Sequence, residues 1–162
     1  MEEVKEEKMK SRSVSIAWKI IMVPNLVGLF FGLLFTFFTD SVLNIGFEPF
    51  TGQSWSGIVS ASPKTAEYVS LWLRGFGVTS LVGMVTAFAI ILMSFRRGER
   101  WSWYALLISS TIAWIFSVVF ALSLGEIPQA IIAVIMLLLA YIALAISAKD
   151  ILSKKIAPKP DV

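Results

Sequence analysis

The sequence predicts an all-α membrane protein, a bundle of four transmembrane helices. Of its 162 residues, 57% are hydrophobic and only 15% are charged, a balance that excludes an ordinary soluble domain. The hydrophobic residues also form four continuous runs of about 20 residues, the length that crosses a hydrocarbon layer of about 30 Å. A β-barrel would instead show segments of about ten residues in which apolar and polar positions alternate.

The first span is predicted over residues 14–38. Trp18 and Lys19 lie at its inner edge, where an indole ring and a long ammonium side chain are both favourable. Pro24 falls inside the span. A helix that began at Pro24 would have only about 15 residues, too few to cross, so we expect one continuous helix with a kink.

Two glycines in the first span, Gly28 and Gly32, are four residues apart. Small residues at this spacing let two membrane helices approach closely. The alternatives for this motif are packing against a helix of this chain, contact with another subunit, and no special role. The long segment that follows leaves this helix free of a tight hairpin, so we expect it to be the one used for outward association.

Residues 40–67 are predicted as one long outer loop, rich in Gly, Ser, Thr and Pro. It also carries the large aromatic residues Phe47, Phe50 and Trp55. Aromatic residues favour the membrane interface, so we expect an ordered flap on the bundle or at the lipid headgroups.

The second span is predicted over residues 69–95. Ser62 followed by Pro63 is typical of a helix start, an N-cap and then proline at the first helical position. A helix from Pro63 to Phe95 would be about 50 Å long, so its first turns would project beyond the bilayer.

The third span is predicted over residues 101–124. Ala113 and Ser117 on this span, and Gly83 on the second, are candidate helix-packing positions because they are small. Trp114 lies near the middle of the membrane, although tryptophan favours interfaces. It is either a packing residue or the wall of a ligand cavity.

The fourth span is predicted over residues 127–148. Gly125 and Pro128 frame a tight reversal before it, glycine ending one helix and proline starting the next. Tyr141 is the aromatic residue of this span, and we include it with Trp114 among the candidate ligand contacts.

The distribution of basic residues predicts the orientation. With four spans both termini share a side, which carries twelve Lys and Arg: five up to Lys19, three between residues 96 and 100, and four after residue 148. The other side carries only Lys64 and Arg74. Because basic residues are retained in the cytoplasm, we predict a multi-pass protein of the cell membrane with both termini cytoplasmic.

Arg74 is the most suggestive candidate site residue, because a charge within an apolar helix often marks function. It falls about 33 Å along the helix from Arg96, near the outer edge of the hydrocarbon layer. There we expect a carboxylate partner from Asp40, Glu67 or Glu126. The alternatives are a structural arginine at the interface and a contact to a ligand or partner protein. A cation or acid–base site built from the outer carboxylates is a further, weaker alternative.

The composition also limits the chemistry. The chain has no cysteine and no histidine, which excludes disulfides, thiolate nucleophiles, imidazole bases and the usual haem, zinc and copper ligands. We therefore expect no cofactor, no metal and no enzymatic activity. The basic residues flank apolar spans, so we expect membrane lipids rather than nucleic acid as their partners.

The segment from Leu71 to Trp103 contains LWLRGFG and FRRGERWSW. It resembles small four-helix integral membrane proteins of the DoxX-like kind. The resemblance implies a four-helix bundle and carries over no catalytic residue.

These observations predict a non-enzymatic protein that acts by association, as an accessory subunit of a membrane complex or as a self-associating bundle. The alternative is a binder or carrier of a lipid or other apolar small molecule. A cavity lined by Trp114 would favour the binder. A flush apolar face covered by a foreign helix would favour the subunit.

Overall fold

The computed structural model describes residues 2–153, with side chains from Arg12 onward. This part of the chain is helical, in the order α1 (Glu2–Phe37), α2 (Thr39–Thr51), α3 (Trp55–Ala61), α4 (Pro63–Met93), the 3₁₀ turn η1 (Phe95–Arg97), α5 (Arg100–Ser123) and α6 (Ile127–Leu152). Among the described helices, α1, α4, α5 and α6 are long and apolar enough to cross a membrane. The predicted all-α fold with four hydrophobic spans is confirmed to that extent.

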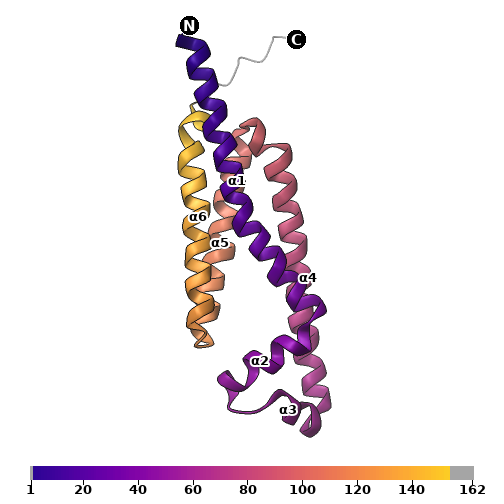
Figure 1. Ribbon diagram of the computed structural model, residues 1–162. Coiled ribbons are helices and arrows are strands. Elements are labelled where there is room, and N and C mark those ends of the chain that lie inside the picture. Colours follow the sequence, from indigo (N-terminus) through magenta and orange to yellow (C-terminus); the bar gives the residue numbers. More distant parts are fainter. Residues whose placement is uncertain (1, 154–162) are drawn as a thin grey trace.

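The four long helices form two antiparallel pairs, α1 with α4 and α5 with α6 (Figure 1). α1 lies beside α6 near its N-terminal end and then crosses toward α4, so it contacts both pairs. The pairs meet at the end that carries η1 and separate toward the end that carries α2 and α3. We call these the turn-side and the loop-side halves of the bundle.

The turn-side half has a dense hydrophobic core. Phe95 of η1 is its largest fully buried side chain, and helices α1, α4, α5 and α6 all contribute to it. Its buried members are Ala17, Ile21, Ile91, Phe95, Leu106, Ala143, Leu144 and Ile151. Alanines on α6 allow the neighbouring helices to approach closely, because they have almost no side chain to keep them apart.

Polar contacts reinforce this half. The Trp103 indole donates to the backbone carbonyl of Leu144 at 2.9 Å, which joins α5 to α6. The Arg100 guanidinium donates to the carbonyl of Leu152, one of the carbonyls at the end of α6 that have no partner inside the helix. The Ser13 hydroxyl donates to the Asp150 carboxylate and so joins α1 to α6.

α1 continues through Pro24 without a break, as the length of the span requires. Pro24 has no N–H and removes one bond of the helical ladder. Beside it, the buried Asn25 side chain donates to the Ile21 carbonyl at 2.7 Å. The intramembrane amide therefore finds its partner within its own helix.

Residues 40–67, which we expected to be a loop, are mostly helical. α2 and α3 are joined by a turn at Gly52, which has a φ of +71°. Trp55 is buried, and its ring lies 5.1 Å from that of Phe47. This contact, with Leu43 and Ala66, gives the two short helices a core of their own. The prediction missed these two helices because their glycine, serine and proline content is typical of loops.

α4 begins at Pro63, as predicted, with Ser62 as its N-cap residue. The Ser62 hydroxyl shares a hydrogen bond of 2.7 Å with that of Thr65 and does not cap the backbone. The first turns of α4 extend past the reversal between α5 and α6 (Figure 1). That reversal uses Gly125 at a φ of +74°, a conformation that glycine adopts without strain.

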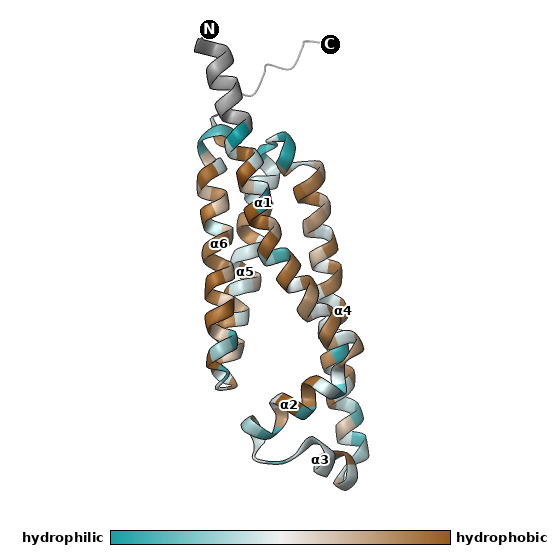
Figure 2. Ribbon diagram, viewed as in Figure 1, coloured by the Kyte–Doolittle hydropathy of each residue, from teal (hydrophilic) through white to brown (hydrophobic). Residues whose placement is uncertain are grey.

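Hydrophobic residues cover the long helices, and hydrophilic residues gather at both ends of the bundle (Figure 2). The described basic residues on the spans and their turns fall at two ends: Arg12, Lys19, Arg96, Arg97, Arg100 and Lys149 at the turn side, and Lys64 and Arg74 at the loop side. Six other lysines of the tally lie outside the residues whose side chains are described: Lys5, Lys8, Lys10, Lys154, Lys155 and Lys159.

Candidate functional site

The separation of the two helix pairs leaves a cavity of about 280 Å³ in the loop-side half. All four long helices line it, and the walls are mostly apolar. The lining residues are Gly28, Phe31 and Phe35 of α1; Phe76, Thr79, Ser80, Gly83 and Met84 of α4; Ala113, Trp114, Phe116, Ser117 and Phe120 of α5; and Gln129, Ile132 and Ala133 of α6. The volume is close to the lower limit of about 300 Å³ for small-molecule sites.

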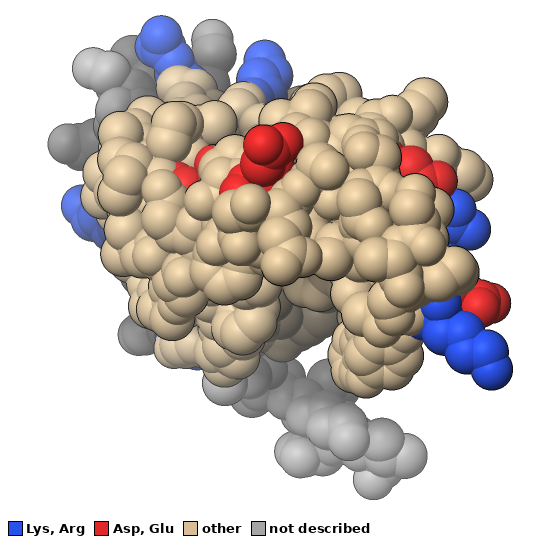
Figure 3. Space-filling model, turned by 90° about the horizontal axis from the view of Figure 1, so that it is seen from below, with Lys and Arg blue, Asp and Glu red and all other residues tan. Residues whose placement is uncertain are grey.

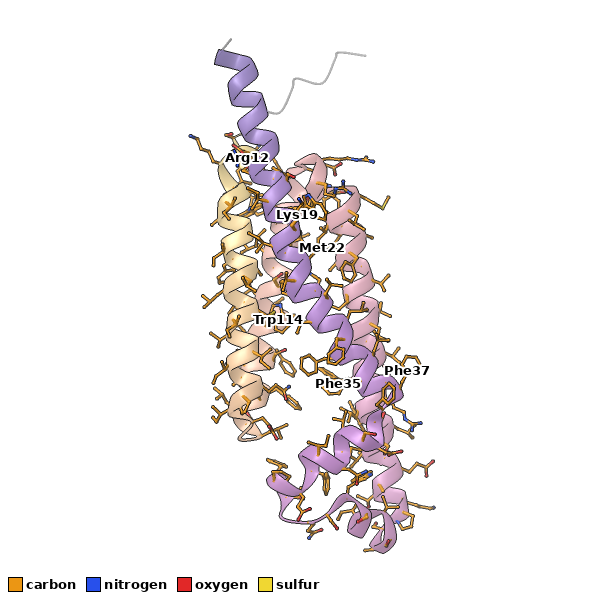
Figure 4. All side chains as sticks on the ribbon, viewed as in Figure 1. Arg12, Lys19, Met22, Phe35, Phe37 and Trp114 are labelled. Carbon is orange, nitrogen blue, oxygen red and sulfur yellow. The ribbon has the colours of Figure 1, made fainter. Side chains whose placement is uncertain are left out.

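Trp114 lines this cavity from α5. Figure 4 shows it and Phe35 of α1 in the space between the helix pairs, while Phe37 points away from it. Of the two predictions made for this tryptophan, the structure therefore favours the wall of a cavity over a packing residue enclosed among helices. Trp114 is half-buried, as a ring that forms such a wall should be.

A row of phenylalanine rings crosses the cavity and joins the separated helices. The Phe35 and Phe76 rings lie 5.8 Å apart, those of Phe76 and Phe120 lie 6.4 Å apart, and those of Phe120 and Phe116 lie 6.2 Å apart. Separations of this size are typical of favourable aromatic pairs. We call these four residues the phenylalanine bridge, since their rings join α5 to α4 and α1 across the gap.

The polar groups of the lining fall into two kinds. Thr79, Ser80 and Ser117 donate their hydroxyls to carbonyls one turn back in their own helices. Within the described residues, the indole N–H of Trp114 and the amide of Gln129 have no hydrogen-bond partner. An apolar cavity with unpaired donors on its walls favours an occupant that brings an acceptor for them.

The predicted packing residues behave in two different ways. A Cβ built on Gly28 would lie 2.6 Å from the Met84 sulfur, and one on Gly32 would lie 3.0 Å from a Leu81 methyl group. These glycines pack against α4 of the same chain, so the expectation that they face outward is wrong. α1 crosses toward α4 along its length (Figure 1), and Gly28 and Gly32 belong to the part of α1 that contacts α4.

The small residues of α4 and α5 do not pack against each other. A Cβ added to Gly83 would meet no atom within 4 Å, and Ala113 and Ser117 line the cavity on the opposite side. The gap between α4 and α5 is therefore bordered by small residues on both helices. Gly83, Ala113 and Ser117, which we predicted as helix contacts, border the cavity instead.

Arg74 has a hydroxyl group as its hydrogen-bond partner, where we expected a carboxylate. Its Nε donates to the Thr39 hydroxyl at 3.3 Å, and that hydroxyl donates to the Phe35 carbonyl at 2.7 Å. Thr39 is almost fully buried at the junction of α1 and α2, while Arg74 is exposed. The arginine therefore joins α4 to the start of α2 at the loop-side end, away from the cavity lining.

The other predicted contacts are dispersed. Asp40 and Glu67 are exposed on α2 and α4, and Glu126 precedes α6. Seen from the loop-side end, charged groups are scattered over a mostly uncharged face (Figure 3). Tyr141 shares a hydrogen bond of 2.9 Å with Thr111 and so joins α6 to α5 outside the cavity. In the described part of the chain, no three acidic residues lie close enough to hold a metal ion.

Sequence reasoning missed the phenylalanine bridge and Gln129. Part of the signal for the bridge was present, because Phe116 and Phe120 are four residues apart on one helix face. Gln129 is one residue after Pro128, in the first turn of α6, where a polar residue is easily assigned to the solvated end of a helix. A comparison of the chain with protein-family models, curated proteins and solved structures finds no match.

Proposed function

We propose that the chain binds one apolar, chain-like molecule, such as a membrane lipid or a related ester, in the cavity lined by Trp114. This function is non-enzymatic. The observation that carries it is the cavity itself, with its aromatic bridge and its two unpaired donors. The apolar chain of such a ligand would contact the aromatic walls, and a carbonyl oxygen would accept a hydrogen bond from one of the donors.

The access route supports a ligand that comes from the membrane. The cavity lies between helices that are apolar enough to cross a bilayer, and small residues border the gap between α4 and α5. Gln129, in the first turn of α6, marks the end of the cavity closer to the membrane surface. A lipid-like molecule would place its chain against the phenylalanine bridge and its polar group near Gln129.

The proposed orientation places the loop-side half on the outer side of the cell membrane and both termini in the cytoplasm. The basic residues gathered at the turn side support it. Because the chain has no cysteine, single cysteines can report the side directly. In intact cells, an impermeant thiol reagent should label Ser56→Cys and spare Ser153→Cys. Labelling of Ser153→Cys alone would show the opposite orientation.

The binding proposal can be tested by filling the cavity. Gly83→Leu places a large side chain in the cavity where no neighbouring atom obstructs its Cβ. We expect the affinity for a brominated fatty-acid methyl ester, measured by quenching of tryptophan fluorescence in detergent, to fall by at least about tenfold, or 1.4 kcal/mol. Gly75→Leu is the matched control, since it lies on the same helix, is equally unobstructed and does not line the cavity.

Equal affinity of Gly83→Leu and wild type would overturn the proposal. A brominated alkane of the same chain length has no ester group and therefore tests whether the ester contributes to binding. If Gln129 binds the ester carbonyl, Gln129→Leu should weaken the ester and leave the alkane unchanged. An equal effect on both probes would show that the amide takes no part in recognition.

A second candidate function is association with another membrane polypeptide through the same gap. The unpacked Gly83 favours it, because small residues border many contacts between membrane helices. The cavity is too narrow for a helix about 10 Å across, so a partner could insert only a side chain. Particle mass in nanodiscs separates the two. A mass above that of one chain, reduced by Gly83→Leu, would favour association over lipid binding.

A further inference from the structure

A basic and aromatic patch lies at the turn-side end of the bundle, far from the cavity. The Arg96 guanidinium of η1 lies over the Trp18 ring of α1, 4.8 Å from its centroid. The Lys19 ammonium lies 6.0 Å from the same centroid. Two cations from distant parts of the chain therefore meet at one indole. Figure 4 shows Lys19 on the part of α1 that lies next to the η1 turn.

The patch is held in place by the core beneath it. Ala17 and Ile21, on either side of Trp18 and Lys19 in α1, are fully buried. Phe95, directly before Arg96, is also fully buried, and Gly98 ends η1 with a φ of +70°. Both cations are therefore carried by backbone that the turn-side core fixes. An arginine held on an aromatic face keeps its planar group ordered before any ligand arrives.

The charge of the patch is not neutralised inside the chain. Lys19 and Arg96 are exposed, and neither forms an ion pair with any side chain of the described residues. The nearby acids have other partners, since Glu99 accepts the Trp101 indole N–H at 2.6 Å and Asp150 accepts from Ser13. Like charges near one ring repel each other, so an anion bound beside both cations would be favourable.

We infer that Lys19 and Arg96 bind the phosphate of an anionic phospholipid headgroup, with Trp18 as the floor of the site. Tryptophan favours the membrane interface, the level at which headgroup phosphates lie. A guanidinium binds phosphate oxygens through two parallel hydrogen bonds, and basic sites between membrane helices bind anionic headgroups. The patch is separate from the cavity and does not depend on its occupant.

Two double variants with the same loss of charge test the inference. Lys19→Gln/Arg96→Gln removes the patch, while Arg12→Gln/Lys149→Gln removes two exposed charges from the same end without touching Trp18. Phosphatidylglycerol and phosphatidylcholine with identical chains are titrated onto the purified protein, and bound lipids are counted by native mass spectrometry. One cation near an anionic surface contributes about fivefold, so the patch variant should lose about 25-fold in affinity for phosphatidylglycerol.

The control double should lose about twofold or less, because screening weakens charges more than about 8 Å from the phosphate. Equal losses in the two doubles would overturn the inference and leave only a general attraction. So would equal affinity of wild type for the two lipids. Inorganic phosphate in excess should not displace the lipid; displacement would show that the site binds free phosphate instead.

A change in folding is excluded by a third variant. Arg96→Lys keeps the charge and loses the planar group that stacks on Trp18. It should retain more phosphatidylglycerol affinity than Lys19→Gln/Arg96→Gln and less than wild type, at unchanged helix content by circular dichroism. If Arg96→Lys and Lys19→Gln/Arg96→Gln both keep the wild-type affinity for phosphatidylglycerol, neither cation contacts the lipid.

Discussion

The turn-side and loop-side halves use the same helices and differ in how those helices meet. In the turn-side half, large side chains such as Phe95 and Ile21 share one core with the small Ala143 of α6, and the core residues are fully buried. In the loop-side half, small residues on α4 and α5 border a cavity, and phenylalanine rings cross the gap. Hydrophobic residues run along the long helices in both halves (Figure 2).

This difference shows that apolar composition does not bring membrane helices together. Lipid chains are as apolar as leucine, so a helix gains little from exchanging lipid for a neighbouring helix unless their surfaces fit. Where a large residue meets an alanine, the helices fit and the core is dense. Where small residues face each other without close approach, lipid or a ligand can fill the gap at low cost. The loop-side cavity is therefore compatible with a stable bundle.

The largest expected effect comes from removing the centre of the dense half. Phe95→Ala deletes a fully buried ring and should reduce the free energy of unfolding by about 3 kcal/mol, because the neighbouring side chains cannot fill the space. Phe116→Ala deletes the same atoms from a ring that is 56% exposed and lines the cavity. Phe116→Ala should reduce the free energy of unfolding by about 1 kcal/mol or less, since lipid replaces the lost contacts.

Unfolding in mild detergent, followed by circular dichroism during titration with a denaturing detergent, measures both variants. If they lose equal stability, the two halves are equally dense and the comparison between them fails. A large loss in Phe116→Ala alone would show that the phenylalanine bridge, and not the turn-side core, holds the bundle together.

The sequence predicted the elements whose signals are local. The four long apolar helices, the helix start at Pro63 and the reversal at Gly125 follow from hydrophobic length and from residues with fixed backbone preferences. The continuity of α1 through Pro24 followed from the length that a membrane requires. None of these needs knowledge of a neighbouring helix.

Contacts between helices were much harder to predict. Gly28 and Gly83 are equally small, yet an added Cβ would meet Met84 at Gly28 and no atom within 4 Å at Gly83. The choice depends on the tilt of α1, which no local pattern encodes. Arg74 was assigned a carboxylate partner by charge, but the start of α2 brings the Thr39 hydroxyl to it. The sequence indicated Trp114 as a possible cavity wall and could not decide between the two alternatives.

A smaller effect is expected at the point where α1 and α4 approach most closely in the loop-side half. A Cβ built on Gly77 would lie 2.7 Å from the backbone nitrogen of Thr36 and 2.9 Å from the carbonyl carbon of Phe35. Backbone atoms cannot move aside as a flexible side chain can, so the two helices must separate. Gly77→Ala should therefore cost about 2 kcal/mol, within the usual range of 1–3 kcal/mol for overpacking.

Gly75→Ala is the matched control, because its Cβ meets no atom within 4 Å and lies two residues away on the same helix. Alanine is the better helix former by up to about 1 kcal/mol, so this variant should be as stable as wild type or more so. Hydrogen exchange measured by mass spectrometry shows which part of the chain is destabilised. In Gly77→Ala, exchange should rise in α1 after Gly32, where the added methyl group forces α1 away from α4, and stay unchanged around Ile21 in the turn-side core. Faster exchange in both halves would show that they unfold as one unit, whereas unchanged exchange and stability would show that α1 and α4 do not approach as closely as the structure places them.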